Sequence, residues 1–504
     1  MTVLFGRSIL CPHHDRLVNS DECEGQQSPP GTRKGAGWAL FFGQTLPGLA
    51  SSPSLVSLVK NVMSSPQSLG AGNETALDHV LGEEYEHAPV PPAARRSVVS
   101  VATVWISFPM ILTSAMTGSI LVAGMGFGRG LTAMLVGNLL MFAYVCLLGG
   151  LGAKHGLNFA LLASRVFGRK GYALASGLLS SLLLGWYAVQ TGITGILIHS
   201  SSGANYLVMT FVAGVLYLAV TFIGIRGLHW LGMISVPLFL ALGTWVAVDA
   251  AGHAGWSTVL AYGGTNPASS TAFGVGLTIV ISLFVDAGTV SADFNRWAKN
   301  GRDSLIATFT AFPFANCYAM LMGGIMTAAI ALPSPQPFAM DNMFGYMLQQ
   351  HRTWLSAIAV IFLFCSLGSV CAHCLYNSAV GWSRIAGIKM RTAAVILAVV
   401  GIAVAAANVW ALFIPWLSLL GIIVPPIGSI VIVDLYLARP GAEIDRDWRA
   451  QAFAAWAIGS VTAYLVEKQF PEISTAISAF VVSAIAYGLI ARLLKNASTS
   501  ANRA

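Results

Sequence analysis

The chain has 504 residues, of which 56% are hydrophobic and only 9% are charged, whereas soluble proteins carry roughly 25% charged residues. This composition excludes a soluble globular protein and indicates an all-α integral membrane protein embedded in the lipid bilayer. The formal net charge is +7. Because the basic residues lie at the ends of apolar segments and form no basic face, no nucleic-acid partner is expected.

Residues 1–92 differ in composition from everything after them. They are rich in Ser, Pro, Gly and His, and prolines interrupt their weak apolar runs. We interpret them as a cytoplasmic N-terminal extension without stable structure. The alternative is that Met63 is the true first residue, in which case residues 1–62 are not translated. A twelve-helix domain is then expected at 93–497, followed by a tail at 498–504.

From about residue 98 onward, apolar runs follow one another, and each is close to the ~20 residues that a spanning helix needs. We expect twelve transmembrane helices, at residues 98–123, 131–152, 172–197, 205–225, 230–250, 273–294, 305–331, 354–379, 392–412, 414–438, 450–467 and 472–494. After residue 92, nineteen Lys and Arg residues lie in one set of loops and three in the other. Because basic loops stay in the cytoplasm, both termini are expected there, with the protein in the plasma membrane.

Two of the expected helices contain features that disfavour a plain span. The first contains the run Thr113–Ser119, whose small and hydroxyl residues favour an interruption at its middle. The sixth contains the stretch Ser282–Thr289, with the carboxylate Asp286 near mid-membrane and a possible break point at Ala287-Gly288. An unpaired charge at that depth costs at least ~3 kcal/mol, so Asp286 must face protein or water.

Interrupted helices five spans apart enter the membrane from opposite sides. That pattern is typical of a five-plus-five inverted repeat, in which unwound backbone at the midplane binds substrate and ions. For the first helix alone, the alternative is that small residues merely let helices pack closely.

The third expected helix carries Trp186 and Gln190, which are four residues apart and therefore share a face. An indole ring one turn from an amide suits a flat, hydrogen-bonding ligand, and Phe284 would supply a second aromatic wall. The alternative is that Trp186 packs within the bundle and Gln190 bonds to a neighbouring helix.

The eighth expected helix carries a polar stripe, in which the members are spaced by three, four and three residues: Ser366, Ser369, His373 and Tyr376. A stripe this regular faces protein or water rather than lipid. Its hydroxyl oxygens suit a small hard cation. His373 either titrates or is a satisfied interior histidine.

The tenth expected helix contains Pro425 and Pro426, which interrupt helical hydrogen bonds and mark a candidate gate hinge. Asp434, near its cytoplasmic end, either takes part in coupling or pairs with a nearby Arg or Lys. Together with His373, these residues are the candidates for gating or coupling.

From Glu84 to its C-terminus the chain resembles the nucleobase-cation symporter family, and within it the cytosine and purine permeases. The motifs that carry the resemblance are YEHAPVP at 85–91, GNLL at 137–140, GAKHGL at 152–157, Gly185-Trp186, AGT at 287–289 with ADF at 292–294, and PPIG at 425–428 with Asp434. The resemblance implies an inverted-repeat transporter core of five plus five helices, with two further helices at the C-terminus.

The resemblance also implies that a flat base is clamped between aromatic groups at Trp186 and Phe284, with Gln190 as a polar contact. We add Ser282 and Asp286 as substrate-binding candidates. Asp286 stands where cytosine permeases carry a serine, so the ligand need not be cytosine. A carboxylate there would accept hydrogen bonds from ring NH or amino groups or, when protonated, couple transport to protons.

In the family members that use sodium, the ion lies between backbone carbonyls of helix one and hydroxyls of helix eight. The candidate cation ligands here are Met116, Ser366 and Ser369. Val370 stands where a further hydroxyl is expected, which weakens a sodium site and leaves proton coupling open. Apart from Na⁺ or H⁺ as coupling ion, no metal or cofactor is expected.

The sequence therefore predicts a monomeric secondary active transporter, not an enzyme. It would import a nucleobase or related small planar heterocycle (cytosine, purine, pyrimidine or hydantoin-like) by cation or proton symport through alternating access. One alternative is a transporter of the same fold for an amino acid or quaternary amine, whose cation would lie against Trp186 and Asp286. The other is a membrane receptor that binds without transport.

Overall fold

The computed structural model describes residues 83–266, 270–332, 335–338, 340–441 and 443–501. Contacts divide the chain into Met1–Asn73 and Glu74–Ala504, and all described residues belong to the second unit. The predictions for residues 1–82 therefore lie outside the described residues.

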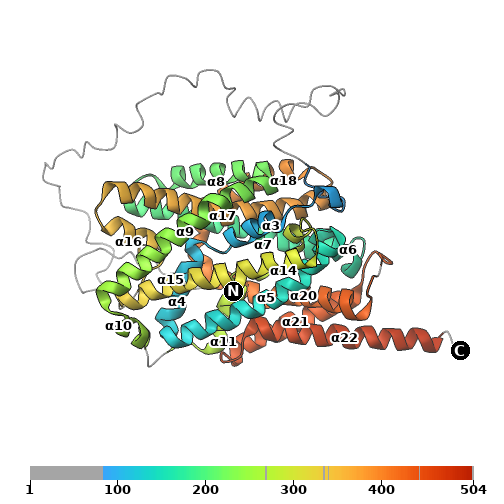
Figure 1. Ribbon diagram of the computed structural model, residues 1–504. Helices are drawn as coiled ribbons and strands as arrows, with labels where there is room; N and C mark the ends of the chain where they lie inside the picture. Colours follow the sequence, from blue (N-terminus) through green and yellow to red (C-terminus); the bar gives the residue numbers. More distant parts are fainter. Residues whose placement is uncertain (1–82, 267–269, 333–334, 339, 442, 502–504) are drawn as a thin grey trace, which may run out of the picture. The chain divides into compact units, whose positions relative to one another are not determined.

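Helices make up most of the described chain, as the composition predicts (Figure 1). In chain order they are η1 (Pro92–Ala94), α3 (Val98–Ser107), α4 (Leu112–Met125), α5 (Phe127–His155), α6 (Phe159–Phe167), α7 (Tyr172–Ser202), α8 (Tyr206–Ile223), α9 (Ile225–Ala254), α10 (Trp256–Ala261), α11 (Phe273–Ser282), α12 (Val285–Thr289), α13 (Ala292–Asn295), α14 (Gly301–Phe309), η3 (Thr310–Asn316), α15 (Cys317–Ile330), α16 (Met343–Gln349), α17 (Thr353–Ala386), α18 (Met390–Ala406), η4 (Val409–Leu412), α19 (Phe413–Ile423), α20 (Pro425–Ile432), η5 (Val433–Ala438), α21 (Ala450–Gln469) and α22 (Thr475–Ala501). The all-α prediction is confirmed for this part of the chain.

Each of the twelve predicted ranges contains helix. Within the described residues, eight helices are long and apolar enough to cross a membrane, and the bent pair α3–α4 would make a ninth. The apolar helices α11 and α18 are shorter. The membrane character of the chain is therefore clear, while the number of spans stays a prediction.

The first predicted span is broken at residues 108–111, where α3 and α4 meet at an angle of 51°. Pro109 has no N–H to donate, and its ring clashes with the preceding turn, so α3 ends just before it. The predicted interruption at Thr113–Ser119 is wrong, because this run forms regular helix in α4. Two of its hydroxyls bond to carbonyls of the same helix: Thr117 Oγ1 donates to the Thr113 carbonyl at 2.8 Å and Ser119 Oγ to that of Ala115 at 3.2 Å.

The sixth predicted span is also broken, between α11 and α12. Phe284 leaves the helical conformation there, with φ −136° and ψ 12°. The break lies about one turn before the predicted point at Ala287-Gly288, which is inside α12. A Cβ on Gly288 would lie 2.9 Å from side-chain carbons of Met141 and Val145 of α5, so glycine serves close packing at this position and not a break.

A third interruption separates α19 from α20. Pro425 and Pro426 occupy the first positions of α20, where a missing N–H removes no hydrogen bond within the new helix. The predicted interruption at the proline pair is confirmed, and its role as a hinge stays a prediction.

Helix α4 packs against α15 at near backbone contact. A Cβ on Gly118 would lie 1.9 Å from the Met320 carbonyl oxygen, and one on Gly323 would lie 2.0 Å from that of Ala115. Without Cβ atoms the two backbones approach closely, which is how small residues associate helices in membranes. This contact fixes the half of the broken helix that follows the break.

We expect Gly323→Ala to destabilise the protein, because the added methyl group must push the α15 backbone away from α4. Overpacking of this kind costs about 1–3 kcal/mol, which should lower the thermal unfolding temperature of the detergent-purified protein. Gly252→Ala in α9 is the matched control, since no atom lies within 4 Å of a Cβ there. Equal unfolding temperatures for the two variants would contradict the packing argument.

Candidate functional site

A small cavity of about 10 Å³ lies where both broken helices meet α7 and α17. Its wall is formed by residues of the first break, of α7, of the second break with α12, and of α17. The lining residues are Phe108, Ile111, Trp186, Gln190, Leu283, Phe284, Asp286, Ala287, Val370 and Cys374. The breaks thus place irregular backbone beside an internal space, as membrane proteins require of non-helical segments.

Four of the five predicted substrate-binding residues line this cavity together: Trp186, Gln190, Phe284 and Asp286. Ser282 is not part of the lining. It is fully buried, and its Oγ lies 2.7 Å from where a Cβ on Gly421 of α19 would stand. The structure therefore places Ser282 at the contact of α11 with α19.

The aromatic walls are held in place from behind. The Trp186 ring packs edge to face on Phe413, with centroids 5.7 Å apart. The Phe284 ring meets Phe108 in the same way at 5.2 Å, and Phe108 stacks on His373 at 4.9 Å. Such pairs add roughly 0.5–1.5 kcal/mol beyond area burial, so the faces that a flat ligand would meet are rigid.

The polar groups of the cavity are incompletely satisfied. Asp286 is fully buried, and its Oδ1 accepts a hydrogen bond from the Ala287 N–H at 2.8 Å. Among the described residues, its Oδ2 and the indole Nε1 of Trp186 form no hydrogen bond of normal geometry, although the two side chains lie close enough to interact with each other. A buried polar group without a partner costs about 1–3 kcal/mol, which a ligand bearing complementary groups would recover.

No ion pair involves Asp286 among the described residues. The cavity therefore combines two aromatic faces, a free carboxylate oxygen and side-chain N–H donors. This arrangement can bind a small planar compound by stacking and hydrogen bonding. The described residues contain no cluster of three or more His, Cys, Asp or Glu that could hold a metal.

The two candidate serine ligands bind the backbone at the first break. Ser366 Oγ accepts from the N–H of Leu112 at 2.7 Å, where α4 begins. Ser369 Oγ donates to the carbonyl of Ser107 at 2.8 Å, where α3 ends. The stripe on α17 thus faces protein, as predicted. Met116 is buried within α4 and does not line the cavity.

His373 continues the same stripe and lies between two carbonyl groups. Its Nδ1 is 2.6 Å from the carbonyl oxygen of Ser369, and its Nε2 is 2.9 Å from that of Val104 in α3. A neutral imidazole can donate to only one of these acceptors, whereas a protonated ring donates to both. His373 therefore ties α17 to α3 and remains a candidate for proton coupling.

The segment before α3 makes contacts that the sequence analysis did not anticipate. Glu84 is buried, accepting from the Tyr376 hydroxyl at 2.8 Å and from the Ile225 N–H at 3.1 Å. Burial raises the pKa of its carboxyl. Arg296 donates to the carbonyl of Tyr85 at 2.8 Å. This segment therefore joins α17, the start of α9 and the end of the sixth predicted span. In the sequence, the motif at 85–91 was the one signal that marked this segment.

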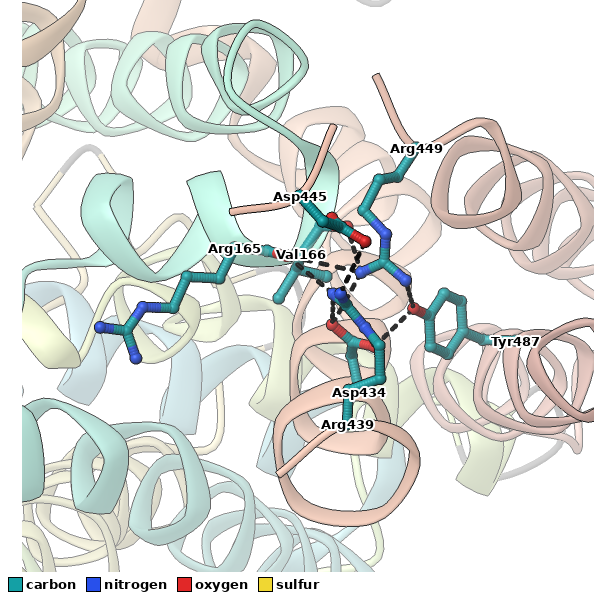
Figure 2. A network of polar contacts seen from close by, with 7 residues as sticks. All are labelled: Arg165, Val166, Asp434, Arg439, Asp445, Arg449 and Tyr487. Carbon is teal, nitrogen blue, oxygen red and sulfur yellow. Dashed lines mark hydrogen bonds and ion pairs between the residues drawn. The ribbon is translucent and has the colours of Figure 1, made fainter. Parts of the chain in front are cut away.

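Asp434 lies apart from the cavity, in a network between the last turn of α6 and the middle of α22 (Figure 2). Its carboxylate accepts from Arg439 at 2.7 Å, from Arg449 at 2.9 Å and from the Tyr487 hydroxyl at 2.7 Å. The predicted pairing with a nearby Arg is confirmed. Arg439 also donates to the carbonyl of Arg165, so the network ties η5 to the last turn of α6.

We expect Asp434→Asn to lower thermal stability markedly, because Arg449, only 5% exposed in its side chain, would lose its counter-ion. Breaking a buried pair in this way costs about 3–5 kcal/mol. Asp445→Asn is the control, since Asp445 also contacts Arg439 but is 51% exposed. Thermal unfolding of both variants measures the difference, and equal stabilities would show that the network contributes little.

The chain is similar to a known permease family and to individual permeases. A family model described as "Permease for cytosine/purines, uracil, thiamine, allantoin" matches residues 89–489. The cytosine permease of Escherichia coli (strain K12) is 31% identical over 361 residues, covering 70% of this chain and 81% of the relative. The purine-uracil permease NCS1 of Arabidopsis thaliana is 23% identical over 279 residues, covering 48% of this chain and 46% of the relative.

Solved structures share the fold. Mhp1, a nucleobase-cation-symport-1 family transporter in a closed conformation with bromovinylhydantoin bound, superposes with a TM-score of 0.69 at 16% identity, covering 83% of this chain and 96% of that one. A Na⁺-coupled sialic acid symporter in a substrate-bound, outward-open state gives 0.61 at 11% identity, covering 84% and 92%. At these identities the likeness shows the fold alone.

Proposed function

Because the chain belongs to the family of permeases for cytosine/purines, uracil, thiamine and allantoin, we propose that its cavity is the binding site of a nucleobase transporter. The protein is a membrane permease, not an enzyme, and it carries a nucleobase or related heterocycle by alternating access. Direction of transport is inward, as the sequence predicts.

One observation supports the proposed site above all others: Trp186, Phe284, Gln190 and Asp286 meet around the same internal space. A base stacks between aromatic rings because every base has a π-face, and such stacking contributes roughly 1–3 kcal/mol per base. The polar groups beside the rings then orient the base. Ser282 is left out of this proposed contact set because of its position between α11 and α19.

The proposed architecture is a domain at 93–497 with twelve membrane spans, in which the first ten form a five-plus-five inverted repeat. The breaks at residues 108–111 and between α11 and α12 support it, because they fall in the first and sixth predicted spans. Residues 1–92 and 498–504 are proposed to lie in the cytoplasm, with a monomeric transporter in the plasma membrane.

Transport is proposed to be coupled to Na⁺ or H⁺. Ser366 and Ser369 support the first, since both hydroxyls lie at the break where backbone groups gather. His373 supports the second, since it lies between two carbonyl oxygens at the same break. Movement about Pro425 and Pro426, with Asp434 anchoring the start of η5, is the proposed gating element.

Radiolabelled nucleobase uptake, measured in cells without endogenous importers, should be competed by unlabelled bases and strongly reduced in Trp186→Ala. Loss of the stacking face should raise the apparent Michaelis constant about tenfold or more. Trp354→Ala is the control, because Trp354 is 59% exposed and does not line the cavity. Competition by amino acids or choline, but by no nucleobase, would contradict the proposed substrate class. Saturable binding without uptake would indicate a receptor.

Replacing external Na⁺ by N-methylglucamine should depress uptake at least tenfold if the ion binds at α17. In that case Ser369→Ala should raise the Na⁺ concentration needed for half-maximal uptake, because a hard cation loses one oxygen ligand. Uptake that does not depend on Na⁺ but is abolished by a protonophore would assign the coupling to H⁺. His373 would then be the first residue to test by substitution.

A further inference from the structure

Tyr144 of α5 contacts both α12, which follows the second helix break, and α20, which follows the third. Its hydroxyl oxygen lies 2.6 Å from Thr289 Oγ1, on the last residue of α12. A Cβ on Gly428 of α20 would lie 1.7 Å from the same hydroxyl oxygen. The tip of this buried tyrosine therefore touches two helices that each begin at a break.

Helix α12 needs support from its neighbours. It is five residues long, and so short a helix has little stability of its own. Two of its residues, Asp286 and Ala287, line the cavity. The hydroxyl of Thr289 donates to the Val285 carbonyl at 2.6 Å. Because that uses its single proton, Tyr144 is the donor in their hydrogen bond.

Helix α5 supplies this support from one face. A Cβ on Gly288 would lie 2.9 Å from side-chain carbons of Met141 and Val145. Together with Tyr144 these two residues are spaced by three and four positions, so all three lie on the same side of α5. Helix α12 is therefore packed on α5 through Gly288 and hydrogen-bonded to it through Thr289.

The contact with α20 lies just after the proline pair. Gly428 is the fourth residue of α20, which begins at Pro425. The point where its Cβ would stand is only 2.5 Å from the Tyr144 ring carbon Cζ, so no side chain fits there while the ring keeps its place. Movement of α20 about the prolines would therefore change the packing of the group that holds α12.

We propose that Tyr144 is a positioning residue for the substrate site, which holds α12 in its ligand-binding position while α20 is packed against it. This inference rests on the proposed function, because the position of Asp286 matters only if the cavity binds a ligand. It connects the ligand site to the proposed gating element. A bound ligand stabilises the arrangement in which α5, α12 and α20 meet, and movement at the proline pair releases it.

Tyr144→Phe tests the hydroxyl, because it keeps the ring that packs on Phe480 at 5.8 Å. Binding to the purified full-length protein is measured with the radiolabelled base, cytosine, uracil or adenine, that the wild-type protein takes up. The Kd should rise about fivefold, since one hydrogen bond is lost. Tyr436→Phe is the matched control and should leave the Kd unchanged. Its hydroxyl also bonds to α5, at the Leu147 carbonyl, but Tyr436 does not line the cavity.

Thr289 provides the second test, which stands alone if Tyr144→Phe does not fold. Thr289→Val should raise the Kd by a similar factor, whereas Thr289→Ser keeps the hydroxyl and should restore the wild-type value. The double variant Tyr144→Phe/Thr289→Val should bind no more weakly than either single variant, because both changes remove the same interaction. A merely structural hydroxyl would lower the unfolding temperature of the ligand-free protein and leave the Kd values equal.

Gly428→Ala tests the contact with α20, because the added methyl group must displace the Tyr144 ring from Thr289. The Kd should rise about fivefold in the wild-type background but less than about twofold in Tyr144→Phe. Additive effects of these two changes would overturn the inference. So would a Kd within about twofold of the wild-type value in well-folded Tyr144→Phe or Thr289→Val.

Failure of the inference is distinguishable from failure of the proposed function. If the wild-type protein takes up none of the three bases, the proposed function fails and the inference falls with it. Equal affinities of the variants and an active wild-type protein overturn the inference alone.

Discussion

The structure depends on one constraint, which is that backbone groups freed by a helix break inside a membrane need partners. In water they would be hydrated, but within an apolar bundle each unsatisfied group costs several kcal/mol. At the first break the partners come from α17: Ser366 binds the N–H of Leu112, and Ser369 binds the carbonyl of Ser107. The break, and the cavity beside it, is therefore held open by side chains from another helix.

The same constraint links the cation candidates to the conformation of the first span. A cation that recruited the oxygens of Ser366 and Ser369 would replace hydrogen bonds that now join α3, α4 and α17. Ion occupancy would then change the energy of the broken helix, whose residue Phe108 also walls the cavity. The ion and the ligand would both act on the same broken helix. Coupling between them would therefore not require a chain of intermediate residues.

Much of the site could be predicted because the chemistry of single residues was distinctive, as with Trp186 and Asp286 in apolar helices. The positions of the breaks could not be predicted in this way, because composition favoured Thr113–Ser119 and Ala287-Gly288 as the break points. Proline geometry places the first break ahead of that run, and Gly288 is explained by packing against α5. The hydrogen bond between Thr113 and Gln190 joins residues that are 77 positions apart in the sequence, so no local sequence pattern predicts it. The burial of Glu84 likewise depends on distant helices.

Two buried carboxylates, Asp434 and Asp286, differ in the groups that surround them. Asp434 accepts hydrogen bonds from two guanidinium groups and a tyrosine hydroxyl. Its charge is therefore compensated, and these bonds hold η5, α6 and α22 together. Asp286 has a single backbone bond and no cation beside it among the described residues. A carboxylate left in that condition is poorly stabilised until something else supplies a donor. Asp286 lines the same cavity as Trp186 and Phe284, and under the proposed function a ligand bound there supplies that donor.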